Sequence, residues 1–204
     1  KDTFSSVTLD NRHSIDLSQY PKRSEYLRLL NKHYRDKNVV FIGTTGNTSR
    51  EMNAFMPDSN NFYMSGNMGG ALSIGLGAAK AGKHVVVCGG DAEFVMHMGG
   101  IATSGRYANE IIDLTYLLFD NESNKSTGGQ RSYQRHVNYT EIVASCGAVV
   151  SSTIDSIDDF LPELLELNKL KGFKFMHIKT SYDADIPRPS AEIIRTSQEA
   201  FLGH

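Results

Sequence analysis

Residues 84–91, HVVVCGGD, are the stretch that decides the fold class. Three valines and a cysteine form a continuous apolar run, which ends at two glycines and Asp91. A short run of this kind is typical of a strand buried on both faces of a parallel sheet. A helical pattern occupies residues 93–107, so the stretch predicts a strand, a turn and a covering helix.

The same alternation of apolar runs and helical patterns continues in both directions. Strands are expected at residues 38–42, 84–88, 111–119, 149–151 and 173–178. Helices are expected at residues 24–35, 48–55, 66–81, 93–107, 139–146, 157–170 and 191–202, with a polar loop at 122–137. This order predicts an α/β fold: a three-layer α/β/α domain with a mainly parallel sheet over residues 21–204, after an arm or interdomain linker at 1–20.

Composition excludes several classes of protein. Of the 204 residues, 40% are hydrophobic and 22% charged, as in a soluble globular domain. A net charge of -2 gives no basic field for nucleic acid or an anionic membrane, and no apolar run approaches the roughly 18 residues of a membrane span. Cys88 and Cys146 lie in apolar segments, so we expect no disulfides and a cytoplasmic location. Because the chain starts at Lys1 rather than Met, we expect a processed or shortened product.

Three polar turns that contain glycine follow predicted strands, at residues 43–48, 89–92 and 120–129. Ligands of parallel α/β sheets bind beyond the carboxyl ends of the strands, so we expect these turns to meet. Asp91 offers a carboxylate and Asn121 an amide oxygen, which are ligand types that Mg²⁺ prefers, and a helix N-terminus after Gly90 can receive phosphate. Each residue alone is also explained by ordinary turn chemistry, but together they predict a metal site.

A family resemblance supports this interpretation. Gly90-Asp91-Ala92, followed at the end of the next predicted strand by Asp120-Asn121, resembles the Gly-Asp-Gly and Asn-Asn signature of thiamine-diphosphate-dependent enzymes. Residues 44–51 (TTGNTSRE), 61–69 (NFYMSGNMG) and 126–130 (STGGQ) resemble segments of the phosphonopyruvate and sulfopyruvate decarboxylases in that group.

The first residues, KDTF, resemble the stretch that follows the first domain of those enzymes. Three positions depart from the usual pattern, because Asn67, Ala92 and Asp120 replace Ser, Gly and Asn. Neither Ala92 nor Asp120 is an expected metal ligand, whereas Asn67 leaves the choice of substrate more open.

The resemblance implies that this chain binds thiamine diphosphate and Mg²⁺. Asp91 and Asn121 would bind the metal through their side chains and Ser123 through its carbonyl oxygen. The turn that comprises Gly90, Asp91, Ala92 and Glu93 would contact the diphosphate.

Four further positions are expected to contact the cofactor. Thr45 and Gly46 would contact cofactor or substrate, although turn chemistry at a strand end explains them almost as well. The carbonyl of Gly66 would accept a hydrogen bond from the 4′-amino group, and Met68 would support the bent cofactor. Without the resemblance, core packing would be the preferred role for Met68.

We expect no catalytic residue in this chain. In the family, a glutamate on a separate pyrimidine-binding domain protonates the cofactor ring, and Glu51, Glu93 and Glu122 all belong to the diphosphate-side segments. The chain is therefore predicted to be incomplete alone, and its missing half to be a domain of the same polypeptide or a partner subunit in a homo- or hetero-oligomer.

The implied reaction converts phosphonopyruvate to phosphonoacetaldehyde and CO₂, a step in 2-aminoethylphosphonate and phosphonate biosynthesis. Its substrate carries a carboxylate and a dianion, so we expect contacts from a loop rich in N–H donors and cations. The candidates are Thr127, Gly128, Gly129, Gln130 and Arg131, with Lys125, Arg135 and His136 nearby. A solvated loop explains the cations about equally well, and His97 is expected to be a packing residue within a helix.

Three alternatives stay open. Sulfopyruvate decarboxylation uses the same fold and cofactor on a less charged substrate. Gly75 and Gly77 could belong to a nucleotide-binding module, but no strand is followed directly by G-x-G-x-x-G with an acidic residue about twenty positions on. A non-catalytic half that binds cofactor to stabilise a partner is the third, although the presence of both Asp91 and Asn121 argues against it.

Overall fold

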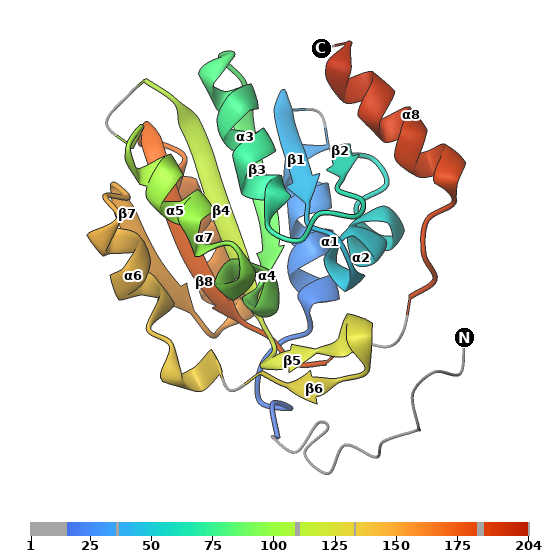
Figure 1. Cartoon of the computed structure of the whole chain (residues 1–204), viewed down its shortest axis with the longest axis vertical. Helices are drawn as coiled ribbons and strands as arrows, with labels where there is room; N and C mark the ends of the chain where they lie inside the picture. Colours follow the sequence, from blue (N-terminus) through green and yellow to red (C-terminus); the bar gives the residue numbers. More distant parts are fainter. Residues whose placement is uncertain (1–15, 36, 109–110, 133, 183–185, 204) are drawn as a thin grey trace.

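The computed structural model describes residues 16–35, 37–108, 111–132, 134–182 and 186–203. Six parallel strands form one sheet in the order β2-β1-β3-β4-β8-β7, and helices cover both of its faces (Figure 1). The strands are β1 (Val39–Gly43), β2 (Asn60–Tyr63), β3 (His84–Gly90), β4 (Asp113–Asp120), β7 (Val150–Ile154) and β8 (Gly172–Lys179). The predicted three-layer α/β/α fold is confirmed, whereas most of the expected arm, residues 1–20, lies outside the described residues.

Alternate side chains of each central strand enter two separate hydrophobic cores. In β3, Val85 and Val87 pack with α3 (Gly70–Lys80), α5 (Met98–Gly105) and α6 (Tyr139–Ser145). Val86 and Cys88 pack on the other face with α1 (Arg23–Tyr34), α2 (Asn47–Phe55) and α7 (Ile157–Leu167). A strand covered on both faces favours apolar residues at every position, which explains the unbroken apolar run at residues 85–88.

The single helix expected at 93–107 and the irregular loop expected at 122–137 both differ from the structure. The helix expected at 93–107 is divided at His97 into α4 (Asp91–Met96) and α5, and two glycines directly after the break lower the helical propensity there. His97 thus lies between two helices rather than within one, and its exposed side chain lies against Gly69 and Gly100.

The polar loop expected at 122–137 contains regular structure. Its strands β5 (Ser123–Asn124) and β6 (Gln130–Arg131) form an antiparallel hairpin, and two 3-10 turns, η1 (Lys125–Thr127) and η2 (Gln134–His136), flank β6. The hairpin holds this segment over the carboxyl end of the main sheet (Figure 1).

The last helix, α8 (Ala191–Leu202), lies along the edge strand β2 (Figure 1). The rings of Phe62 and Phe201 pack with their centroids 4.9 Å apart. An uncovered edge strand offers unpaired backbone groups to other chains, and α8 covers this one.

The connections at the carboxyl end of the sheet diverge between β1 and β3. The chain leaves β1 toward α2 on one face, whereas it leaves β3 toward α4 on the opposite face, where Phe94 packs. Such a divergence opens a crevice beyond the strand ends, which is the usual ligand site of an open α/β sheet.

At the opposite end of the sheet, Asp113 joins β4 to β8. Its carboxylate accepts hydrogen bonds from Lys174 Nζ at 2.5 Å and Lys171 Nζ at 2.7 Å, and the Lys174 side chain is fully buried. Burial alone would raise the pKa of Asp113, but the hydrogen bonds from the two lysines outweigh it and hold this pKa below its usual value.

We therefore expect Asp113→Asn to reduce the free energy of unfolding by about 2 kcal/mol at pH 7, because it leaves a buried ammonium without its counter-ion. Since the folded-state pKa is lowered, the contribution is present above the unfolded pKa and is lost as pH falls through the folded value. Urea unfolding at pH 7 and pH 3 measures both effects, and the difference between wild type and variant should shrink at pH 3. Equal unfolding midpoints at pH 7 would contradict this role.

Candidate cofactor site

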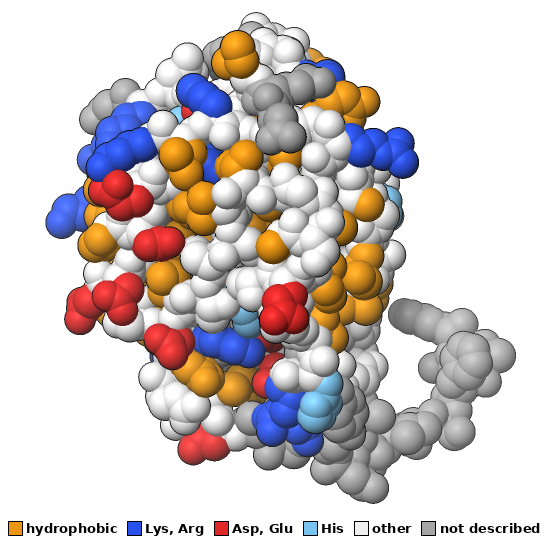
Figure 2. Space-filling model, turned by 90° about the vertical axis from the view of Figure 1, so that its left-hand side faces the viewer, with side chains coloured by type: hydrophobic (Ala, Val, Ile, Leu, Met, Phe, Trp, Pro, Cys, Tyr) orange, Lys and Arg blue, Asp and Glu red, His pale blue; other side chains and the backbone are white. Residues whose placement is uncertain are grey.

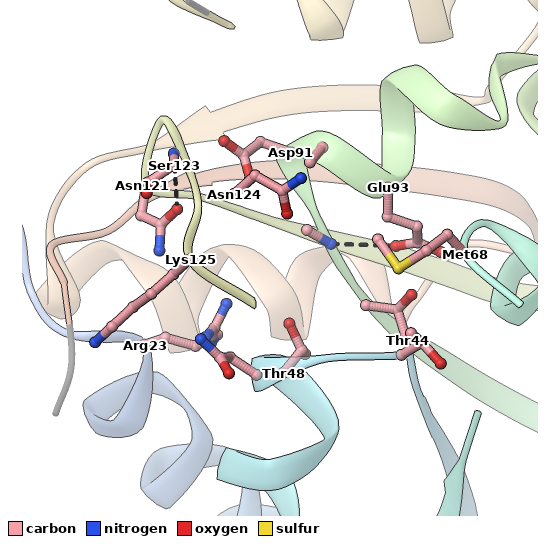
Figure 3. Close-up of a pocket in the computed structure, with 14 residues that line it drawn as sticks. Arg23, Thr44, Thr48, Met68, Asp91, Glu93, Asn121, Ser123, Asn124 and Lys125 are labelled. Carbon is pink, nitrogen blue, oxygen red and sulfur yellow. Dashed lines mark hydrogen bonds between the residues drawn. The ribbon is translucent and has the colours of Figure 1, made fainter. Parts of the chain in front are cut away.

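A cavity opens in the crevice between β1 and β3, and loops from three strand ends surround it (Figure 3). Its lining residues are Arg23, Thr44, Thr45, Asn47, Thr48, Met68, Gly90, Asp91, Ala92, Glu93, Asn121, Ser123, Asn124 and Lys125. The structure thus brings together eight of the positions that the resemblance implied: Thr45, Met68, Gly90, Asp91, Ala92, Glu93, Asn121 and Ser123.

Asp91 lies at the start of α4 with only 4% of its surface exposed. Its Oδ2 accepts a hydrogen bond from the Ser132 hydroxyl at 3.2 Å. Burial raises the pKa of Asp91 to about 8, and the negative charge of Asp120 adds to the rise. A carboxylate held out of water beside a second acidic group favours a bound cation.

The turn after β4 has a strained backbone. Glu122 has a φ of 51°, and among the described residues it is the one position other than glycine with a positive φ. Its N–H donates to Asp120 Oδ1 at 3.0 Å, and the N–H of Ser123 donates to Asn121 Oδ1 at 3.2 Å. An ion pair from Arg135 Nε to the Glu122 carboxylate, at 3.1 Å, helps to hold this turn, which places Asn121 and Ser123 near Asp91 (Figure 3).

Asp120 itself does not line the cavity. Its Oδ2 contacts His177 Nε2 at 2.9 Å and Lys179 Nζ at 2.8 Å. Burial alone would raise the pKa of Asp120, but the His177 hydrogen bond and the Lys179 charge outweigh it and lower this pKa to about 2. Asp120 replaces the usual Asn of the family signature, and the basic side chains of His177 and Lys179 on β8 balance the negative charge that this replacement adds.

Glu93 fixes the turn that leads into α4. Its Oε2 accepts hydrogen bonds from the N–H of Gly90 at 3.2 Å and from the hydroxyl of Tyr116 at 3.3 Å. Burial raises the pKa of Glu93 to about 7, and the Gly90 hydrogen bond partly opposes the rise.

The donors around Asp91 fit Mg²⁺ and a diphosphate. They are all oxygen atoms: the carboxylate of Asp91, the side-chain amide of Asn121 and the carbonyl of Ser123. No cluster of three or more His, Cys, Asp or Glu able to hold a metal exists in the described part of the chain. A bound Mg²⁺ would then take its remaining ligands from phosphate oxygens or water, and the basic residues Arg23 and Lys125 line the same cavity.

A second cavity of about 480 Å³ adjoins the first and shares Thr45, Met68 and Asn124 with it. Gly46 and Gly66 line this second cavity, and Gly66 has a φ of 76°, which favours glycine. Met68 contributes to both walls and belongs to neither hydrophobic core, so core packing does not account for it. The roles expected for Gly66 and Met68 stay predictions.

Of the five loop residues expected to bind substrate, one lines a cavity at the site. Thr127 lines the second cavity, whereas Gly128, Gly129, Gln130 and Arg131 line neither cavity. Thr127 and Gln130 instead hydrogen-bond each other through their side chains at 2.9 Å. Lys125 lies in the wall of the first cavity rather than the second.

Sequence reasoning missed Arg23 entirely. It comes from the first helix, where a charged residue is usually solvated, but its guanidinium is buried and pairs with Glu51 at 2.5 Å and 2.8 Å. Thr44 and Thr48 also line the first cavity, and the segment 44–51 that carries them was the signal that could have identified them.

Comparisons with known proteins agree with this geometry. The sequence pattern of the family described as "Thiamine pyrophosphate enzyme, C-terminal TPP binding domain" matches residues 42–178. Phosphonopyruvate decarboxylase of Streptomyces viridochromogenes is 36% identical over 152 residues, which are 74% of this chain and 37% of that protein. The chain thus spans well under half the length of that relative.

The beta subunits of sulfopyruvate decarboxylases are of similar size to this chain. Sulfopyruvate decarboxylase subunit beta of Methanocaldococcus jannaschii is 32% identical over 146 residues, which are 71% of this chain and 76% of the subunit. The solved structure of benzoylformate decarboxylase from Polynucleobacter necessarius aligns with a TM-score of 0.65 at 19% identity, over 85% of this chain and 36% of that one. With the family pattern spanning all the strand ends that form the first cavity, the chain belongs to the thiamine pyrophosphate enzymes, and the part it represents is their C-terminal, cofactor-binding domain.

Proposed function

We propose that this chain holds the diphosphate and Mg²⁺ of thiamine diphosphate in a decarboxylase that converts phosphonopyruvate to phosphonoacetaldehyde and CO₂. The observation that carries the proposal is the buried Asp91 carboxylate beside Asn121 and Ser123, at the ends of two neighbouring strands. When bound, thiamine diphosphate supplies the electron sink that allows a 2-oxo acid to lose CO₂. The chain's own residues bind and orient the cofactor.

The chain requires a pyrimidine-binding domain or subunit for activity. Two of the nearby glutamates are paired with arginines, because Glu51 pairs with Arg23 and Glu122 pairs with Arg135. Glu93 lies in the turn expected to contact the diphosphate, where its Oε2 accepts from Gly90 and Tyr116, and this placement supports a glutamate on another domain for the cofactor ring. The beta-subunit relatives favour a separate partner chain, whereas the longer phosphonopyruvate decarboxylases favour a second domain of one polypeptide.

Phosphonopyruvate is the preferred substrate, and sulfopyruvate is the alternative. Residues 44–51 and 126–130 resemble the phosphonopyruvate decarboxylases, and these two segments carry the preference. The overall identity to two phosphonopyruvate decarboxylases, 36% and 35%, is close to the 34% identity to one sulfopyruvate decarboxylase beta subunit. The two acids differ in the charge of the head group, so their relative turnover distinguishes them.

The experiment combines this chain with its pyrimidine-binding partner and measures CO₂ release. We expect CO₂ release to require both thiamine diphosphate and Mg²⁺. We also expect kcat/KM to be about tenfold higher for phosphonopyruvate than for sulfopyruvate, because a cationic site binds the phosphonate dianion more strongly than the less charged sulfonate. Faster turnover of sulfopyruvate would mean that sulfopyruvate, and not phosphonopyruvate, is the substrate. Calorimetric titration with thiamine diphosphate and with NAD tests the nucleotide-binding alternative, and binding without turnover of either acid would favour a non-catalytic role.

The surface gives no support for a nucleic-acid partner. On the face shown in Figure 2, Lys and Arg side chains share the surface with Asp and Glu side chains, so that this face is not a continuous basic patch. No described helix is long and apolar enough to cross a membrane.

A further inference from the structure

We propose that Arg50 and Arg188 form the subsite that binds the anionic head group of the substrate. The proposal rests on the proposed function and deepens it by assigning residues to the phosphonate. The two arginines come from distant parts of the chain, since Arg50 belongs to α2 and Arg188 precedes α8, yet both line the second cavity.

The charged side chains that line the second cavity are all positive. Its described lining residues include both arginines and no aspartate or glutamate. Neither arginine forms a hydrogen bond or ion pair within the described part of the chain. No carboxylate of the described lining neutralises the two guanidinium groups, so both are available to a bound anion.

The chemistry of the remaining wall suits a small acid. The hydroxyl groups of Tyr63 and Ser65 add possible donors, whereas Met64 and Met96 give apolar surface. Two planar guanidinium forks can share the oxygens of a tetrahedral dianion, which a single cation satisfies less well. The volume of about 480 Å³ is ample for a three-carbon acid with one phosphonate group.

The position of the second cavity places such a molecule beside the cofactor. It shares Thr45, Met68 and Asn124 with the first cavity, so a molecule held there lies next to the cofactor site. The loop at residues 128–131, which the sequence suggested for this role, lines neither cavity.

The segment that carries Arg188 lies beyond the residues that match the family pattern. The family pattern ends at residue 178, and residues 186–194 contribute Arg188, Pro189 and Ile194 to the cavity. The Ser190 hydroxyl caps α8 by accepting from the N–H of Ile193 at 3.2 Å, and Phe201 anchors the helix on β2. The packing of α8 on β2 (Figure 1) thus fixes the segment that precedes the helix, and Arg188 of that segment can select the substrate.

Calorimetric titration of the complete holoenzyme with 3-phosphonopropionate tests the subsite without any turnover. This probe has a carboxylate and a phosphonate but no 2-oxo group. We expect Arg50→Met and Arg188→Met each to weaken its binding about tenfold and the double variant about 100-fold. Arg195→Met, an exposed position of α8 outside the cavity, is the matched control and should change the affinity less than about twofold.

Thiamine diphosphate affinity should be the same in all four variants, which separates loss of the subsite from loss of folding. Failure of wild type to bind the probe, or equal binding by wild type and the double variant, overturns the proposal. If the probe binds through the arginines but no 2-oxo acid is decarboxylated, the subsite stands and the proposed function falls. If decarboxylation of phosphonopyruvate is independent of both arginines, the proposed function stands and the subsite falls.

Discussion

Replacing Asp91 with asparagine should weaken Mg²⁺-dependent binding of thiamine diphosphate by more than about 100-fold. Asp91 is the one carboxylate in the set of proposed metal ligands, and asparagine keeps its shape and one oxygen but removes the charge. Calorimetric titration of the complete assembly, with and without Mg²⁺, measures the effect.

The folding of the variant can be predicted separately. Because burial and the neighbouring Asp120 disfavour the charge of Asp91, Asp91→Asn without ligand should be at least as stable to urea as wild type. Asp113→Asn is the matched control, because it should lose stability at the far end of the sheet while keeping cofactor affinity within about twofold. Unchanged affinity in Asp91→Asn would mean that the metal binds elsewhere and would overturn the proposed function.

The central strands could be predicted from the sequence because both of their faces are buried. The strands expected at 38–42, 84–88 and 173–178, which are rich in apolar residues, match β1, β3 and β8 to within two residues at either end. The edge strands were harder, because only one side of each pairs with a neighbour. The segment NNFY of β2 begins with two polar residues, and its pairing with β1 identifies it as a strand.

The site was predictable where it follows from topology. Asp91 and Asn121 follow strands that are neighbours in a parallel sheet, so the order of elements was enough to place them together. The contributions of Arg23 and Arg188 depend on how the two terminal helices pack, and no local pattern encodes such packing. The break at His97 was missed because the helical spacing continues through it, although Gly99 and Gly100 lower the helical propensity there.

Replacing Asp120 with alanine should reduce the free energy of unfolding by about 3–5 kcal/mol. The Asp120 side chain is fully buried, and its loss would leave the basic groups of His177 and Lys179 without their acidic partner. Alanine also removes the acceptor for the N–H of Glu122, so the strained turn that carries Asn121 and Ser123 should loosen. Urea unfolding measures the first effect, and titration with thiamine diphosphate and Mg²⁺ measures the second.

Asp120→Asn separates the two roles of this residue. The amide oxygen can still accept from the Glu122 N–H but carries no charge, so stability should fall while cofactor affinity stays within about twofold of wild type. In the double variant Asp120→Asn, Lys179→Met, the removal of one uncompensated cation should restore part of the stability, since a buried pair is costly chiefly when one member is missing. If Asp120→Ala unfolds at the same urea concentration as wild type, the contacts of Asp120 with His177 and Lys179 do not hold β4 to β8. The inferred balance between the Asp120 charge and these two basic side chains would then be wrong.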